Sequence, residues 1–159
     1  MYWRGHVGLG LLTYAPFAAV ALVADELRLA GVGVVLAIAF APLPDADQHL
    51  PIAHRGPTHT IAFIVATGAI ATLTSVFVTA LFGFSPPSWT PLFVFGVTTA
   101  TLGSHLVGDV LTPMGIRPFR PVSGAHFTLN VTPAKNRRAN LALLGLGIVA
   151  MAVAVAVAG

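Results

Sequence analysis

The stretch of chain that most restricts the fold runs from residue 56 to residue 108, and it contains no Lys, Arg, Asp or Glu. It is long enough for two membrane helices, because one span needs about 20 apolar residues. Three prolines within residues 86–91 interrupt it, and proline lacks the amide donor that a helix interior requires. We therefore predict two spans, over residues 60–82 and 92–110.

The composition of the whole chain agrees with this reading. Hydrophobic residues make up 56% of the 159 residues and charged residues 8%, whereas a soluble domain carries roughly a quarter charged residues. Cysteine is absent, which excludes disulfides, thiolate metal sites and cysteine nucleophiles. We predict an all-α integral membrane protein that forms a single membrane-embedded domain over residues 1–159.

Three further apolar runs bring the expected number of transmembrane helices to about five. They cover residues 7–24, 29–43 and 141–159. The second covers only about 22 Å as a helix, less than the roughly 30 Å hydrocarbon core, so it either thins the bilayer or pairs with the first run as a re-entrant hairpin. The last run is rich in small residues, which allow close helix packing.

A cleaved signal peptide is a competing interpretation of the first run. Arg4 precedes the apolar stretch, and residues 19–21 read Ala-Val-Ala, which is an acceptable cleavage motif. Cleavage would remove His6, which is a candidate site residue below.

The basic residues predict the orientation. If all five runs cross, the N-terminus, the loop at 44–58 and the loop at 113–139 share one side, and that side holds seven of the eight Lys and Arg residues. Only Arg28 lies opposite. The positive-inside rule makes the basic side cytoplasmic, and a re-entrant hairpin would not change this. We expect a multi-pass protein of the inner (cytoplasmic) membrane, with lipids as partners and no nucleic-acid partner.

His105 and Asp109 are the most informative polar pair. Their i, i+4 spacing places both on one helix face, inside a span where an unpaired ionisable residue costs several kcal/mol. One interpretation is a shared metal ion. The alternative is a His–Asp hydrogen bond that stabilises helix packing.

A second polar cluster lies in and beside the cytoplasmic loop before the third run. It contains Asp45, Asp47, His49, His54 and His59. Carboxylate and imidazole ligands together suit Zn, Mn or Fe. The alternative is a polar loop without metal. His49, like His126 in the long basic loop, is expected to be a surface histidine.

These motifs together resemble the YdjM family, small inner-membrane proteins described as metal-dependent hydrolases. The resemblance extends from His6 to about Pro121. It rests on three segments, which read Leu43-Pro44-Asp45-Ala46-Asp47, His54-Arg55-Gly56-Pro57-Thr58-His59 and Gly103-Ser104-His105-x3-Asp109-x2-Thr112-x2-Gly115. It implies a hydrolase activity, and it places Asp47 and His54 in the family motif.

That family in turn resembles the all-helical zinc phospholipase C and P1 nuclease group, in which an Asp, a His fourteen residues later and a His-x3-Asp pair hold a metal. Asp45, His59, His105 and Asp109 match this order. His6 matches an early histidine that helps to hold a further metal. No later His-x3-Glu pair is present, and Gln48 stands where family members often have His, so the resemblance implies one or two ions.

The expected function is therefore metal-dependent hydrolysis of a phosphoester, lipid or lipid-linked, by a metal-activated water. Zn is the expected ion, with Mn or Fe possible. Asp47 is a further ligand or the general base, and Arg55 either binds a phosphate oxygen or anchors its loop to lipid headgroups. The alternatives are a divalent-metal transporter, whose ligands should lie near mid-membrane, and a non-catalytic membrane scaffold.

Overall fold

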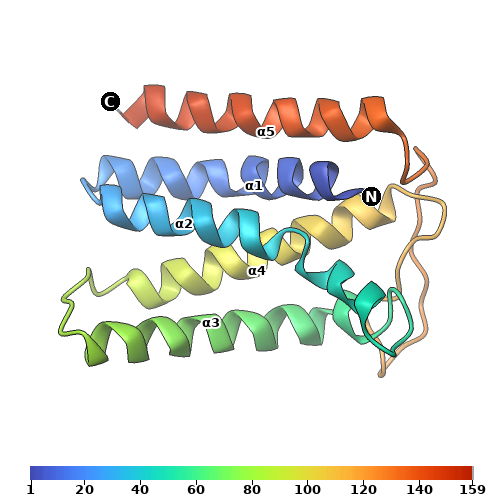
Figure 1. Ribbon diagram of the computed structural model, residues 1–159, viewed down its shortest axis with the longest axis horizontal. Helices are drawn as coiled ribbons and strands as arrows, with labels where there is room; N and C mark the ends of the chain where they lie inside the picture. Colours follow the sequence, from blue (N-terminus) through green and yellow to red (C-terminus); the bar gives the residue numbers. More distant parts are fainter. Residues whose placement is uncertain (159) are drawn as a thin grey trace.

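Five α-helices dominate the part of the chain that the computed structural model describes, residues 1–158 (Figure 1). Two short 3₁₀ helices, η1 and η2, lie between the second and third. In chain order the elements are α1 (Trp3–Val23), α2 (Leu27–Phe40), η1 (Leu43–His49), η2 (Pro57–His59), α3 (Ile61–Leu81), α4 (Thr90–Val110) and α5 (Arg137–Ala158). Residues 1–158 contain no named strand, so the all-α prediction is confirmed.

Five helical segments are long and apolar enough to cross a membrane, as predicted. The second consists of α2 together with η1, from Leu27 to His49. Taken alone, α2 has 14 residues and covers about 21 Å, and η1, which carries Asp45, follows it in the connection at 41–60. The bounds of the other four lie within a few residues of the predicted ones.

The start of the last helix was predicted too late. It begins at Arg137 instead of residue 141, because the side-chain oxygen of Asn136 accepts hydrogen bonds from the backbone N–H groups of Arg138 (3.1 Å) and Ala139 (3.3 Å). Such a side-chain cap satisfies amide groups that otherwise lack partners in the first turn. The charged residues at 137–138 had hidden this helix start in the hydropathy pattern.

The central helix of the bundle is α1, which packs against α2, α4 and α5. Buried Tyr14 donates a hydrogen bond to the carbonyl of Ala30 in α2, at 2.6 Å. On the other side, α1 and α5 approach so closely at Gly8 and Gly147 that a Cβ on either would lie within 2.4 Å of the other helix's backbone. The predicted role of small residues in the last helix is therefore confirmed at Gly147.

The outer helices are α3 and α5. Only 11% of the residues in the most apolar window of each are buried, against 56% for α4. Since these exposed faces are almost wholly apolar, they are suited to contact lipid.

The helices alternate in direction, so the N-terminus and the connections at 41–60 and 111–136 gather at one end of the bundle (Figure 1). The last connection is irregular, as predicted, apart from an isolated bridge between Ile116 and Phe127. It also covers the end of α4, because the amides of Leu129 and Val131 donate to the carbonyls of Val110 and Leu111. This end of the bundle carries the polar residues.

Candidate metal centre

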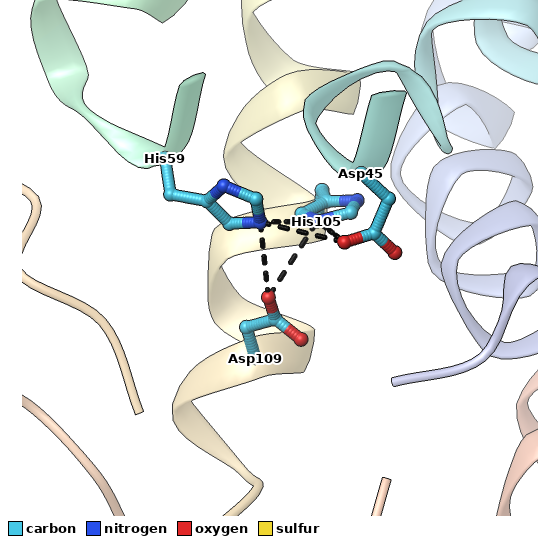
Figure 2. A group of neighbouring side chains, drawn as sticks. All are labelled: Asp45, His59, His105 and Asp109. Atoms are coloured by element: carbon cyan, nitrogen blue, oxygen red, sulfur yellow. Dashed lines mark hydrogen bonds and ion pairs between the residues drawn. The ribbon is translucent and has the colours of Figure 1, made fainter. Parts of the chain in front are cut away.

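Four side chains from three separate segments meet at this end of the bundle (Figure 2). Asp45 comes from η1 and His59 from the last residue of η2. His105 and Asp109 lie one turn apart near the end of α4. The hydroxyl of Thr60 caps α3 by accepting from the Phe63 amide, which fixes where that helix begins and thus where His59 lies. His59, His105 and Asp109 are fully buried, whereas the Asp45 side chain is 18% exposed.

One atom from each residue points to a common centre, and these four atoms lie within 4.8 Å of one another. The Nε2 atoms of His59 and His105 are 3.2 Å apart. Asp109 Oδ2 lies 3.3 Å from the first and 3.6 Å from the second. Asp45 Oδ1 lies 3.6 Å from His59 Nε2 and 3.8 Å from His105 Nε2. Figure 2 shows these contacts as dashed lines.

The hydrogen bonds behind the two histidines assign their tautomers. Nδ1 of His105 lies 2.7 Å from the backbone carbonyl of Ala41, which can only accept, so Nδ1 carries the hydrogen. Nδ1 of His59 lies 3.0 Å from the Thr58 hydroxyl, which itself donates to Asp47. Both Nε2 atoms therefore present lone pairs to the centre, as metal-ligating histidines do when a carbonyl or carboxylate holds their other nitrogen.

This donor set fits a cation. Two lone pairs face each other at 3.2 Å, beside a buried Asp109 Oδ2 that has no hydrogen-bond partner among the described residues. Such an arrangement is repulsive unless a proton or a metal ion lies within it. Burial alone would lower the pKa of His59, but the nearby carboxylates of Asp109 and Asp45 together outweigh burial and raise it above its ordinary value. The four residues could hold a metal ion in place of that proton.

Asp47 and His54 lie beside this group, behind His59. Asp47 Oδ1 is 2.8 Å from His54 Nδ1, and its Oδ2 accepts from the Arg55 amide and the Thr58 hydroxyl, both at 2.9 Å. The same oxygen is 3.3 Å from His59 Nδ1. With Asp45 these two residues form a second group close enough to hold an ion. Asp47 is thus placed to orient His59, and its predicted roles as ligand or general base stay predictions.

Arg55 is turned toward Asp109. Its Nη2 donates to Asp109 Oδ1 at 2.7 Å, and its Nη1 donates to the Thr112 hydroxyl and the Gly115 carbonyl at 2.9 and 3.0 Å. Both terminal nitrogens of the guanidinium are therefore engaged within the protein. Arg55 also holds a left-handed backbone conformation, with φ of 57°, which turns the loop between His54 and Gly56.

His6 lies at the edge of the cluster. Its ring stacks on His105 with centroids 3.6 Å apart, and its Nε2 lies 3.6 Å from both Asp45 Oδ2 and Asp109 Oδ1. The same nitrogen is 3.0 Å from the carbonyl of Met1, whose amino group lies 2.5 Å from Asp109 Oδ1. His6 thus adjoins the four central residues without belonging to their common group.

An open cavity of about 410 Å³ leads to the cluster from the end of the bundle, and Asp45, His54 and Arg55 line it. This volume is within the range of small-molecule sites. His49 and His126 are exposed and outside the cluster, as predicted.

Sequence reasoning missed three of the groups that hold this site together. The Ala41 carbonyl orients His105, the Thr58 hydroxyl links Asp47 to His59, and the Met1 amino group contacts Asp109. A backbone carbonyl carries no sequence signature. Only the position of Thr58 inside the conspicuous Pro57–His59 segment could have pointed to its role.

The comparisons with known proteins agree with the membrane architecture. A family model described as YdjM inner membrane protein matches residues 1–159. Neither the curated proteins nor the solved structures yield a match to this chain.

Proposed function

Because this chain belongs to the YdjM inner membrane protein family and gathers its buried imidazoles and carboxylates at one end of the spans, we propose that it is a membrane-bound metal-dependent hydrolase. The substrate class is a phosphoester, lipid or lipid-linked. The observation that carries the proposal is the convergence of two histidine lone pairs and two carboxylate oxygens beneath an open cavity. The predominantly basic end of the bundle, which holds the site, would face the cytoplasm.

A divalent ion held by Asp45, His59, His105 and Asp109 would supply Lewis-acid chemistry, which activates water and polarises a phosphoester. Imidazole with carboxylate suits zinc, and one or two ions fit the two neighbouring ligand groups. The order of these ligands along the chain is also that of the zinc phospholipase C group, a similarity that stays a prediction.

The chain's own residues have distinct tasks in this proposal. Ala41 and Asp47 fix the orientation of the two histidine rings, and Arg55 compensates the buried charge of Asp109. Asp45 is the one carboxylate of the central group that solvent reaches, and it lines the cavity, so it is placed to accept a proton from water.

The depth of the site favours hydrolysis over metal transport. His105 and Asp109 occupy the last two turns of α4, and Asp45 and His59 lie in connections at the same end. Transport sites are generally found near the middle of the bilayer, between structural repeats.

The test combines metal analysis with a hydrolysis assay on the purified full-length protein. We expect stoichiometric zinc and hydrolysis of p-nitrophenyl phosphate esters or of phospholipid in mixed micelles. His105→Ala and Asp109→Ala should lose both, whereas His126→Ala, which removes an exposed histidine outside the cluster, should keep both.

Equal metal content in all these proteins would refute the ligand set. Stoichiometric metal without hydrolysis, together with zinc uptake into proteoliposomes, would favour transport. Absence of metal from the wild type would favour a non-catalytic scaffold.

A further inference from the structure

A second cavity opens beside the one that leads to the metal centre. Its volume is about 430 Å³, and it lies where α1 and α5 begin. Arg4, Lys135 and Arg137 line it, with Tyr2, Trp3 and Leu141 among its apolar wall. Tyr2 and Lys135 also line the first cavity, so the two share a boundary.

The walls of this second cavity are held together by Asn140, whose side chain is buried. Its carbonyl oxygen accepts from the Tyr2 amide at 3.0 Å, and its amide nitrogen donates to the carbonyls of Ala134 (2.9 Å) and Asn136 (2.7 Å). One side chain thereby ties the start of α1 to the loop before α5. Gly5 makes the approach possible, since a Cβ there would lie 2.3 Å from Asn140 Oδ1.

The lining charge of this cavity is entirely positive. Arg4, Lys135 and Arg137 form no ion pair within residues 1–158, and no carboxylate lines the cavity. Three exposed cations around one opening attract an anion, and guanidinium groups match the geometry of phosphate oxygens.

The surroundings of these cations are apolar and face the membrane. Tyr2, Trp3 and Leu141 are 58%, 57% and 41% exposed, and they stand at the ends of two apolar helices. Aromatic side chains in this position are typical of the boundary between headgroups and acyl chains. A ligand that satisfies both parts of the cavity has an anionic head and an apolar tail.

We propose that this cavity binds the phosphate-bearing headgroup of an anionic phospholipid from the surrounding leaflet, with its acyl chain beside Trp3 and Leu141. The shared boundary at Tyr2 and Lys135 then places the headgroup next to the metal centre. The inference that this lipid is the substrate rests on the proposed hydrolase function, and it narrows the substrate class to a membrane phospholipid. Binding of the lipid does not itself depend on hydrolysis.

Trp3 provides a reporter for the test. In a Trp89→Phe background, where Trp3 is the remaining tryptophan, the full-length protein is placed in phosphatidylcholine nanodiscs. A small fraction of lipid with brominated acyl chains, either phosphatidylglycerol or phosphatidylcholine, is then added. We expect brominated phosphatidylglycerol to quench Trp3 at a lower mole fraction, because each cation near a lipid surface favours an anionic headgroup about fivefold.

The decisive variant is Arg4→Gln/Lys135→Gln/Arg137→Gln, in which this selectivity should disappear. The control is a second triple variant that loses the same charge from the same end of the bundle but outside the cavity, namely Arg117→Gln/Arg120→Gln/Arg138→Gln. It should keep the selectivity of the parent protein. Circular dichroism and gel filtration verify that both variants fold.

Three results would overturn the proposal. Equal quenching by the two lipids in the parent protein would show that no anionic headgroup is selected. If both triple variants lost the lipid selectivity equally, the selectivity would come from the overall positive charge of this end of the bundle and not from the cavity. If excess inorganic phosphate abolished the selectivity, the cavity would be a site for a soluble anion instead of a lipid.

Repeating the assay with His105→Ala separates lipid binding from hydrolysis, since lipid binding should persist when hydrolytic activity is lost.

Discussion

Replacing Asp47 by asparagine tests how the metal centre is held in place. The Asp47 carboxylate has four neighbours: His54 Nδ1 at 2.8 Å, the Arg55 amide and the Thr58 hydroxyl at 2.9 Å, and His59 Nδ1 at 3.3 Å. The Arg55 amide and the Thr58 hydroxyl each donate a hydrogen bond to it. Asparagine keeps one accepting oxygen and replaces the other by an NH₂ group, which can only donate.

The expected consequence is a weaker but still complete site. Whichever way the new amide is turned, the negative charge behind His59 is lost, and with it the electrostatic support that a carboxylate gives to a metal-ligating histidine. Loss of a carboxylate behind a metal-ligating histidine typically weakens metal binding by about 10–100-fold, which corresponds to about 1.4–2.7 kcal/mol. We therefore expect Asp47→Asn to reduce zinc affinity by this factor while the number of bound ions stays the same.

The measurement is a competition titration with a chelating zinc dye, combined with elemental analysis at saturating zinc. Asp25→Asn is the matched control. Asp25 is exposed in the turn between α1 and α2, and its left-handed backbone, with φ of 61°, also suits asparagine. This control should bind zinc like the wild type.

Two outcomes would contradict the reasoning. Unchanged zinc affinity in a folded Asp47→Asn protein would mean that the Asp47 charge does not support His59 as a metal ligand. Loss of one bound ion at saturation would make Asp47 a ligand, as the sequence alone had allowed.

Three further predictions follow from the packing and the cluster. Gly8→Val should lower the melting temperature, with a cost of about 1–3 kcal/mol, because its Cβ would lie 2.4 Å from the backbone of α5; Gly145→Ala, which has open space around it, should change little. Tyr14→Phe should cost about 1 kcal/mol in the same thermal assay, since the buried hydrogen bond to α2 is lost without a change in shape. Zinc at a hundredfold excess over its dissociation constant should stabilise the wild type by about 2.7 kcal/mol. If zinc stabilised His105→Ala as much as the wild type, this result would count against the site.

Much of the candidate site could be predicted from residue type and spacing. His105 and Asp109 lie on one helix, where the i, i+4 spacing alone makes them neighbours. Asp45 and His59 lie in separate 3₁₀ segments, and only their shared membrane side and the family resemblance linked them to that pair. The structure brings all four together, because α2 ends and α3 begins at the end of the bundle where α4 ends.

The roles around this group could not be predicted in the same way. The residue type of Arg55 predicts a contact with a phosphate oxygen or with lipid headgroups, and the structure adds contacts of both its terminal nitrogens with groups of the protein, Asp109 among them. Asp47 stays a predicted ligand or base, and the structure adds a contact that its residue type does not indicate, with His59 Nδ1 at 3.3 Å. Residue type indicates that such side chains need polar partners but leaves open which partner lies nearest.

Composition and charge pattern are enough to predict the membrane-spanning helical architecture and the end of the bundle that carries the polar residues. An apolar run of about 20 residues can satisfy all its backbone groups within itself only as a helix, so local composition suffices. The packing of the helices and loops shows which polar groups share a centre and which ones lie behind it and orient them. Those contacts join residues as distant along the chain as Ala41 and His105, and they depend on how helix ends and loops are placed together, which no local pattern specifies.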